Sequence, residues 1–385
     1  MEPSEFSAIL DAVRTFIDRE VVPAEDEIEE TDAIPERIRA AAADMGLFGY
    51  ALPEEFGGLG LSMTEEVQLA MTLGRTAPSF RSMFGTNNGI AGQVLVNFGT
   101  DEQKEAYLPG LAAGELVASF ALTEPDAGSD PSGIRTKAVR VDGGYRISGQ
   151  KRFITNAPEA DVFMVFARTG EVADGTKGIS VFAVDADRAG VTVGPPDRKM
   201  GQRGAHTAEV FLDDVEVGPE ALIGGVEGEG FGAAMRSLAK SRLHIAALSV
   251  GMAERLIEES VDHAVTQTQG GTPIADFQLV QAMLADSRTE AYAGRAMVME
   301  AARSYDDGSD RWMAPSCAKL FCTEMVGRVA DRAVQVHGGL GYMRDTKVER
   351  FYRDARLYRL YEGTSEIQKV IIAKQLIRAA RREGR

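Results

Sequence analysis

Apolar residues in the first hundred positions recur at the three- and four-residue spacing of amphipathic helices. The first such stripe consists of Phe6, Ile9, Val13, Phe16 and Ile17. Pro23 should end this helix, because proline lacks a backbone donor and clashes with the preceding turn. The same spacing predicts further helices over 35–45, 64–73 and 101–108. We therefore expect a helical region from about residue 6 to residue 114.

From about residue 117 the pattern changes to the alternation that is typical of β-strands. Val139 and Val141 alternate with polar neighbours, and the glycine-rich segment 142–144 follows them, which predicts a hairpin. Further short strands, bounded by Gly, Pro and Asp, are expected over 162–167, 178–184, 191–193 and 208–212.

After Gly224-Gly225 the helical spacing returns. Long helices are expected over 230–268, 275–305, 312–337 and 365–382. The order of helices, strands and helices differs from the strand–helix alternation of doubly wound nucleotide folds. We therefore expect a mainly α protein with a central antiparallel β domain. The expected domains are residues 1–117, helical, 118–225, the β domain, and 226–385, helical.

Composition and charge narrow the class of protein. The 385 residues include 42 basic and 58 acidic side chains, a net charge of −16, which argues against nucleic-acid binding. No apolar run reaches the length of a membrane span, and the N-terminus lacks the layout of a signal peptide. A soluble cytoplasmic enzyme, with no membrane insertion, is the expectation. A polyanionic ligand would then need a local basic site.

Cysteine and histidine usage predicts neither a disulfide nor a metal site. Cys317 and Cys322 are five residues apart in an expected helix, so reduced core thiols are favoured. The four histidines are scattered along the chain and form no cluster with ligand spacing.

The segment from Leu360 to Lys374 carries the most informative chemistry. Glu362 stands before a glycine and directly ahead of an expected helix. Ser365 and Gln368 fit the capping-box pattern for the start of that helix. A carboxylate held on a short segment against a helix is aimed, as proton abstraction requires. The alternative is an ordinary acidic residue that stabilises the helix N-terminus.

Several separated motifs resemble those of the acyl-CoA dehydrogenase family. They are Phe120–Asp130, Gln150–Ala157, Lys199–Val217, Gln335–Tyr342, Arg353–Gln368 and, more weakly, Thr272–Gln278. The resemblance covers nearly the whole chain, and the motifs occur in the family's order. It implies an N-terminal α domain, a middle β barrel or sandwich and a C-terminal four-helix bundle. It also implies FAD as the cofactor.

The residue types in these motifs suit a flavin. Thr123 and Ser129 supply hydroxyls, and Gly128 allows close approach of backbone N–H groups. Phe153 is a flat apolar partner for the ring, with Thr155 on the same face of the strand, although an aromatic here could also be core. By resemblance, the FAD-binding residues are Phe120, Leu122, Thr123, Gly128, Ser129, Phe153, Thr155, Gln278, Gln335, Gly338, Gly339, Thr364 and Glu366. The family receives FAD from a neighbouring subunit at the segment matching Gln335, Gly338 and Gly339.

The reaction implied is α,β-dehydrogenation of an acyl-CoA thioester to the trans-2-enoyl-CoA. Glu362 matches the family's base, which also binds the thioester carbonyl through its backbone N–H. Some members carry the base on another helix, where this chain has Ser241, so Glu362 matches the short- and medium-chain type. The substrate-binding residues implied are Ser129, Arg242, Tyr361, Glu362 and Gly363. Arg242 could equally be a surface arginine.

At two positions the sequence departs from the family pattern in residues that bind the cofactor. Gln267 stands where an arginine reaches the FAD pyrophosphate across a subunit interface, and Gly270 stands where a phenylalanine packs. A neutral amide cannot replace a charge-assisted bond. A homotetramer is the first expectation, and a heterotetramer with divided sites is the alternative.

The expected partners are an acyl-CoA and electron-transferring flavoprotein. An acyl-CoA oxidase, another flavin-dependent relative and a non-catalytic subunit of a heteromeric dehydrogenase are the competing hypotheses. Met83, Gly85 and Thr86 are expected to line the acyl cavity, whose depth the sequence does not reveal.

Overall fold

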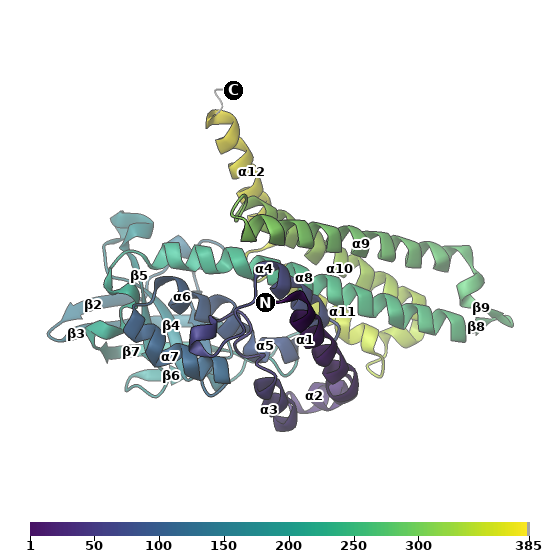
Figure 1. The fold of residues 1–385 in the computed structure, drawn as a ribbon, viewed down its shortest axis with the longest axis horizontal. Helices are drawn as coiled ribbons and strands as arrows, with labels where there is room; N and C mark the ends of the chain where they lie inside the picture. The colour runs from purple at the N-terminus through teal and green to yellow at the C-terminus, as the bar shows by residue number, and fades with distance from the viewer. Residues whose placement is uncertain (383–385) are drawn as a thin grey trace.

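The computed structural model describes residues 1–382 and places the β domain at one end of an elongated helical body (Figure 1). The N-terminal helices are α1 (Pro3–Phe16), α2 (Glu25–Thr31), α3 (Glu36–Asp44), α4 (Met63–Leu73), α5 (Pro78–Asn88), α6 (Ile90–Phe98) and α7 (Asp101–Ala113). The expectation that Pro23 ends the first helix is wrong. The chain stays helical through a π turn over Ile17–Val21 and a 3-10 turn over Val22–Ala24. Pro23 is tolerated because it lies in the first turn of the 3-10 segment, where its missing N–H has no partner to lose.

The middle domain is a seven-stranded curled sheet. Its strands are β1 (Ala118–Ala121), β2 (Lys137–Val141), β3 (Gly144–Thr155), β4 (Val162–Arg168), β5 (Ile179–Asp185), β6 (Val191–Val193) and β7 (Thr207–Val217). The predicted β2–β3 hairpin is confirmed, and β3–β7, β4–β5 and β6–β7 are also antiparallel. The sheet differs from the antiparallel expectation at β4, which β1 and the start of β2 join in parallel. The long connection from β1 to β4 brings the chain back in the same direction, as parallel pairing requires.

The C-terminal region is a bundle of long helices. They are α8 (Gly230–Thr266), α9 (Gln278–Asp306), α10 (Met313–His337), α11 (Lys347–Tyr358) and α12 (Ser365–Arg382). A two-stranded hairpin of β8 (Thr268–Gln269) and β9 (Thr272–Pro273) joins α8 to α9 at the end of the bundle remote from the sheet (Figure 1). Helix α12 leaves the body of the molecule.

Three cores hold the molecule together. The first packs α1 and α4 against α8, α9, α10 and α11, so the two helical regions share one interior. The second and third lie on the two sides of the sheet. Strand β4 shows the division, because Met164 and Phe166 face α6 and α7 while Phe163 and Val165 face the other side. The expected boundaries at 117/118 and 225/226 fall in the connections that flank the sheet.

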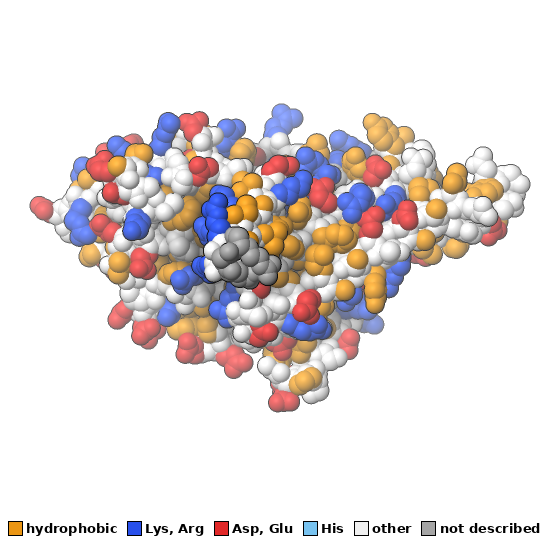
Figure 2. Space-filling view, turned by 90° about the horizontal axis from the view of Figure 1, so that it is seen from above, with side chains coloured by type: hydrophobic (Ala, Val, Ile, Leu, Met, Phe, Trp, Pro, Cys, Tyr) orange, Lys and Arg blue, Asp and Glu red, His pale blue; other side chains and the backbone are white. Residues whose placement is uncertain are grey.

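Apolar side chains gather on the face seen in Figure 2, near the base of α12. On α9 and α12 the exposed large ones are Leu279, Tyr292, Val370, Leu376 and Ile377. An uncovered apolar surface of this kind is typical of a face that another molecule covers.

Other predicted features concern cysteines and membranes. Cys322 is buried, Cys317 is half-buried, and both are free thiols, as predicted. No helix within residues 1–382 combines the length and the apolar character that spanning a bilayer requires. The described part of the chain contains no group of three His, Cys, Asp or Glu side chains that could hold a metal ion.

Candidate active site

The loop between α11 and α12 holds Glu362 in an unusual backbone conformation. Glu362 has φ 56° and Gly363 has φ 89°, two consecutive residues in the left-handed region. The side-chain amide of Gln368 donates to the carbonyls of Glu362, at 3.2 Å, and Gly363, at 2.9 Å. Lys319 Nζ donates to the same Gly363 carbonyl at 2.8 Å. The loop is therefore fastened to the start of α12 and to α10.

The capping box predicted for α12 is wrong in its residues. Thr364 is the cap, because its hydroxyl accepts from Ile367 N at 3.3 Å. Ser365 lies inside the helix and donates to Glu324 Oε1 at 2.6 Å. The side-chain amide of Gln368 donates to the carbonyls of Glu362 and Gly363 instead of bonding to Ser365, the partner that the capping box predicts. With Thr364 as the cap, the helix begins at Ser365, one residue earlier than the capping pattern assumed.

The Glu362 carboxyl is buried among polar groups that come from distant parts of the chain. Burial raises its pKa, while Arg81 on α5, the Ser241 hydroxyl and Arg242 on α8, and Lys319 act in the opposite direction. Its Oε2 atom is buried and has no hydrogen-bond partner among the described residues. The Glu362 N–H likewise has no backbone acceptor in this part of the chain. A carboxylate oxygen and an N–H group of one residue are thus both available to a ligand.

The cations around the Glu362 carboxyl, Arg242 and Lys319, are buried as well. Burial lowers the pKa of Arg242, and the nearby Glu362 partly restores it. Burial lowers the pKa of Lys319 to about 8, again against the effect of Glu362. Arg242 is buried, so its interpretation as a surface arginine is wrong, and its Nε has no hydrogen-bond partner among the described residues. A buried guanidinium without a full set of acceptors is costly unless a ligand supplies them.

Lys319 and Arg81 were not found from the sequence. Lys319 could have been, because it interrupts the buried stripe of α10 formed by Pro315, Cys322, Val326 and Val329. A charged residue within an apolar helix face signals a buried partner. Arg81 gave no such signal, since the helix that carries it was itself missed.

Tyr361 connects the loop to the β domain. Its ring stacks on that of Tyr358 with centroids 5.9 Å apart and planes 8° apart. Burial raises the pKa of Tyr361 well above its usual range, and the nearby Arg81 and the Gln202 side chain lower it. Gln202 belongs to the loop before β7 and has φ 55°. The segment around Tyr361, which is expected to contact substrate, is thus also held by Gln202 of the β domain.

The ends of β1 and β3 form one cluster of the expected cofactor residues. Ser119 Oγ donates to the Thr155 carbonyl at 2.8 Å, and Arg152 N donates to the Thr123 carbonyl at 2.9 Å. Beneath them the fully buried Lys151 binds Glu124 Oε1 at 2.8 Å, and also the carbonyls of Leu122 and Phe166. Thr123 and Thr155 are therefore held on neighbouring backbones, although they are 32 residues apart in sequence.

Phe153 occupies an irregular position in β3. The register with β7 shifts between Lys151 and Ile154, and Phe153 lies in that shift with φ 57°. Its ring is 56% exposed, and the Arg152 guanidinium lies over it at 4.7 Å from the ring centroid. A bulge that turns an aromatic side chain outward offers a flat apolar face. With the hydroxyls of Thr123 and Thr155, this face fits the ring and polar edge of a flavin.

Asn156 joins this cluster to the helices around Glu362. It follows Thr155 with φ 59°, and its side-chain amide donates to the Ser82 carbonyl at 2.9 Å and to Thr86 Oγ1 at 3.0 Å. Both acceptors are on α5, the helix that carries Arg81. The expected cofactor strand and the Glu362 surroundings therefore meet at one helix.

The other predicted residues divide into two groups. The first group lies on β1, the loop after it, and the start of α12. Leu122 is buried, and Phe120 packs on Phe166. Gly128 and Ser129 lie in an exposed loop after β1, and Glu366 is exposed in the first turn of α12. In the second, Gln278, Gln335, Gly338 and Gly339 are exposed where α9 begins and α10 ends, at the remote end of the bundle (Figure 1). The structure does not bring this second group to Glu362, and the predicted role of Gln335, Gly338 and Gly339 toward a neighbouring subunit stays a prediction.

The two departures from the family lie at the same remote end. Gln267 ends α8, and its side chain is exposed. Gly270 and Gly271 have φ 59° and 83° and form the turn of the β8–β9 hairpin. Two consecutive positive φ values favour glycine, so a phenylalanine would be strained at position 270.

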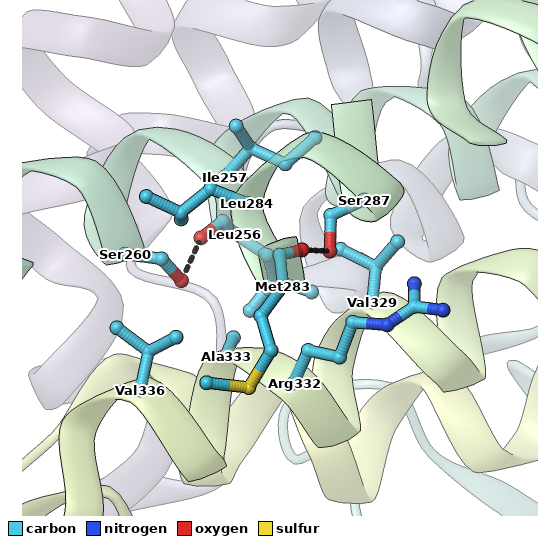
Figure 3. Close-up of a pocket in the computed structure, with 10 residues that line it drawn as sticks. All are labelled: Leu256, Ile257, Ser260, Met283, Leu284, Ser287, Val329, Arg332, Ala333 and Val336. Atoms are coloured by element: carbon cyan, nitrogen blue, oxygen red, sulfur yellow. Dashed lines mark hydrogen bonds between the residues drawn. The ribbon is translucent and has the colours of Figure 1, made fainter. Parts of the chain in front are cut away.

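A crevice between α8, α9 and α10 is unrelated to this site (Figure 3). It is lined mainly by aliphatic side chains, with Ser260, Ser287 and Arg332 at its edges, and leaves no room for a water molecule. None of the predicted site residues lines it, so we interpret it as a packing gap within the bundle.

Models of known protein families match nearly the whole chain. Three family models match in succession: "Acyl-CoA dehydrogenase, N-terminal domain" at residues 3–115, the middle domain at 119–215 and the C-terminal domain at 228–377.

Individual relatives agree with these matches. An acyl-CoA dehydrogenase of Bacillus subtilis is 39% identical over 365 residues, which are 95% of this chain and 96% of that protein. A subunit of the caffeyl-CoA reductase–Etf complex of Acetobacterium woodii is 37% identical, with 92% of this chain and 93% of that protein covered. The solved structure of PigA in complex with FAD has a TM-score of 0.92 and 28% identity, with 98% of each chain covered.

Proposed function

Because the chain belongs to the acyl-CoA dehydrogenase family, we propose that Glu362 is the base that removes the α-proton of an acyl-CoA thioester. The enzyme is an oxidoreductase that acts on a CH–CH group, and its product is the trans-2-enoyl-CoA. The observation that carries this proposal is the buried Glu362 carboxyl, held by left-handed backbone among Arg81, Arg242 and Lys319.

The cofactor of the family is FAD, which when bound accepts the β-hydrogen as a hydride. The residues we propose to hold its ring are Thr123, Phe153 and Thr155, because they lie together and present a flat face and hydroxyl groups. The Lys151–Glu124 pair supports their backbone from below. The exposed residues at the remote end of the bundle, Gln335 and Gly338 among them, would serve the cofactor of a neighbouring subunit.

The surroundings of Glu362 suit abstraction of a weakly acidic proton. A glutamate with its ordinary pKa is too weak a base for a thioester α-proton. Burial raises the pKa of Glu362 and so strengthens it as a base, while Arg81, Arg242 and Lys319 lower the pKa and favour the carboxylate form. The free N–H of Glu362 is available to the thioester carbonyl, where it would stabilise the negative charge that develops.

The test is anaerobic bleaching of the flavin by acyl-CoA substrates. Glu362→Gln should keep bound flavin and acyl-CoA but lose at least about 1,000-fold in the bleaching rate, because the proton has no acceptor. Glu300→Gln, an exposed residue of α9, is the matched control and should behave as the parent. Bleaching by Glu362→Gln at the parent rate would remove Glu362 from the base role. A flavin-loaded protein that no acyl-CoA bleaches would overturn the dehydrogenase proposal.

The proposed electron acceptor is electron-transferring flavoprotein, since a relative forms part of a reductase–Etf complex. An oxidase would instead be reoxidised rapidly by oxygen, so the rate of flavin reoxidation in air separates the two. We propose a homotetramer, supported by the exposed apolar residues of α9 and α12. A non-catalytic subunit of a heteromeric enzyme would purify without flavin.

A further inference from the structure

We propose that Arg81 binds a carboxylate on the acyl group of the substrate, so that the enzyme takes monothioesters of dicarboxylic acids. This inference rests on the proposed function, because it places the acyl group beside Glu362. It assigns a specificity role to a side chain that the α-proton chemistry does not require.

Arg81 lies in the interior with its guanidinium in a fixed place. It is 8% exposed, and it lies over its own helix at Gly85. A Cβ at Gly85 would come within 2.6 Å of Arg81 Nη1, and one at Gly89 within 3.7 Å of Nη2. The absence of side chains at both positions leaves space for the guanidinium. We expected Gly85 to line the acyl cavity, and in the structure the Arg81 guanidinium covers it.

No carboxylate among the described residues forms an ion pair with Arg81. Its hydrogen bond is from Nη2 to His244 Nδ1 at 3.3 Å, and its Nε atom has no partner. On the other side of that ring, His244 Nε2 lies 2.6 Å from Glu66 Oε2. Because a guanidinium can only donate, His244 Nδ1 accepts from Arg81 and Nε2–H donates to Glu66, and burial lowers the pKa of this ring.

The charge of Glu66 is already matched by another cation. Lys240 Nζ lies 2.7 Å from Glu66 Oε1. Glu362, the other acidic group nearby, is shared with Arg242 and Lys319. Both carboxylates beside Arg81 therefore have other cations next to them, and neither forms an ion pair with Arg81. An excess of buried positive charge is costly, and an anionic ligand would relieve it.

The other groups near Arg81 are unpaired phenols. Tyr50 and Tyr358 are buried, and neither hydroxyl has a hydrogen-bond partner within residues 1–382. Arg81 lowers the pKa of both phenols against the effect of burial, which makes them its electrostatic neighbours. The Nε–H of Arg81 and the two phenol O–H groups are donors that lack acceptors, and a carboxylate accepts at both of its oxygens. A methyl-ended acyl chain would leave these donors unsatisfied.

The test compares acyl-CoAs that differ only at the acyl end. Flavin bleaching is measured with pentanoyl- and glutaryl-CoA, hexanoyl- and adipoyl-CoA, and octanoyl- and suberoyl-CoA. In at least one pair the carboxylate-bearing substrate should have a kcat/KM at least about tenfold higher. Arg81→Met should lower that value by about 100-fold or more, and the value of the methyl-ended partner by less than about tenfold. Arg37→Met, at an exposed arginine, is the control and should change neither.

A second measurement separates binding from chemistry. In the Glu362→Gln background, calorimetric titration should show tighter binding of the preferred dicarboxylic thioester than of its neutral partner, and Arg81→Met should abolish the difference. If Arg81 acted only on the base, Arg81→Met would slow both substrates equally and raise the apparent pKa of kcat/KM, which would overturn the proposal. Preference for methyl-ended substrates throughout would do the same.

Two further outcomes remain decisive. If Arg81→Met does not fold, the parent's preference and Arg81→Lys, which keeps the charge but loses the guanidinium fork, still test the proposal. If no acyl-CoA of either kind bleaches the flavin, the dehydrogenase proposal has failed, and the calorimetric difference alone decides whether Arg81 binds a carboxylate.

Discussion

At the scale of single residues, the site is marked by backbone strain. Outside glycine, positive φ values occur at six described residues, and Phe153, Asn156, Gln202 and Glu362 belong to the segments that meet around the site. Such conformations persist only where surrounding contacts hold them, and they concentrate where a side chain must be aimed. Glu362 is held in this way by the amide of Gln368 and the ammonium of Lys319.

Gly363→Ala tests whether this strain positions the base. A Cβ at φ 89° would come within 2.7 Å of Gln368 Nε2, so the amide must move and Glu362 with it. We expect a loss of about 1–2 kcal/mol in unfolding free energy and at least about tenfold in the flavin-bleaching rate. Gly308→Ala, at φ 76° where a Cβ would meet only the Arg311 guanidinium at an ordinary contact distance of 3.7 Å, is the control for backbone strain alone. Equal bleaching rates in the two variants would show that the loop does not position Glu362.

At the scale of elements, the buried pair beneath the ends of β1 and β3 supports the expected cofactor strands. Lys151 is fully buried, and burial lowers its pKa to about 8 while Glu124 raises it. Glu124 also accepts from the backbone N–H groups of Arg135 and Thr136. One ion pair thus joins β3 to the loop after β1 and to the start of β2.

Lys151→Met should destabilise the β domain by about 3 kcal/mol, because it leaves the Glu124 carboxylate buried without its cation. The flavin content of the purified protein should fall with it, since Thr123 and Thr155 lose their common support. Thermal unfolding and flavin absorbance measure the two effects. Adding Glu124→Gln should restore part of the stability, whereas Lys104→Met, in a surface pair with Asp101, should change little. An unchanged flavin content in Lys151→Met would contradict the supporting role.

At the scale of the whole molecule, one buried carboxyl lies at the contact between the sheet and the bundle. Asp354 of α11 accepts from Gln202 N, next to the loop that touches Tyr361. Burial and Glu29 raise its pKa from 3.8 to about 7, while the Gln202 N–H, Arg353 and Arg350 act in the opposite direction. The protonated form is therefore the one that the folded protein prefers.

Because the pKa of Asp354 is raised in the folded state, the stability of the protein should depend on pH. A raised pKa contributes stability that is present at low pH and is lost as pH rises through about 7. Asp354→Asn keeps an acceptor for Gln202 and cannot ionise. The difference in unfolding free energy, variant minus parent, should grow from about pH 4 to pH 7 and level off above it, for a total of up to about 4 kcal/mol. A difference that stays constant with pH would show that Asp354 does not titrate in this range.

Much of the architecture could be predicted because it is local. The long helices α8, α9 and α10 and the β2–β3 hairpin follow from apolar spacing and turn residues, which act over a few positions. Helix α5 could not be found in this way. Its small and polar residues, Ser79, Thr86 and Asn88 among them, are buried, and its Gly85 has low helix propensity. The polar groups of the buried Asn88 side chain are satisfied by tertiary hydrogen bonds, because the amide accepts from Ala51 N and donates to the Leu47 carbonyl. No local sequence pattern reveals these bonds.

The sequence by itself determined the order of the domains, the family, the cofactor and the identity of the carboxylate proposed as base. Those features depend on residue types and spacing within short segments. Only the tertiary structure decided what surrounds that carboxylate. Arg81, Ser241, Lys319 and Glu362 are separated by up to 281 positions, 362 minus 81, and meet through the packing of α5, α8 and α10. Burial and long-range electrostatics set the pKa of Glu362, and tertiary packing leaves Arg81 without a carboxylate partner among the described residues; both arise only when the chain has folded.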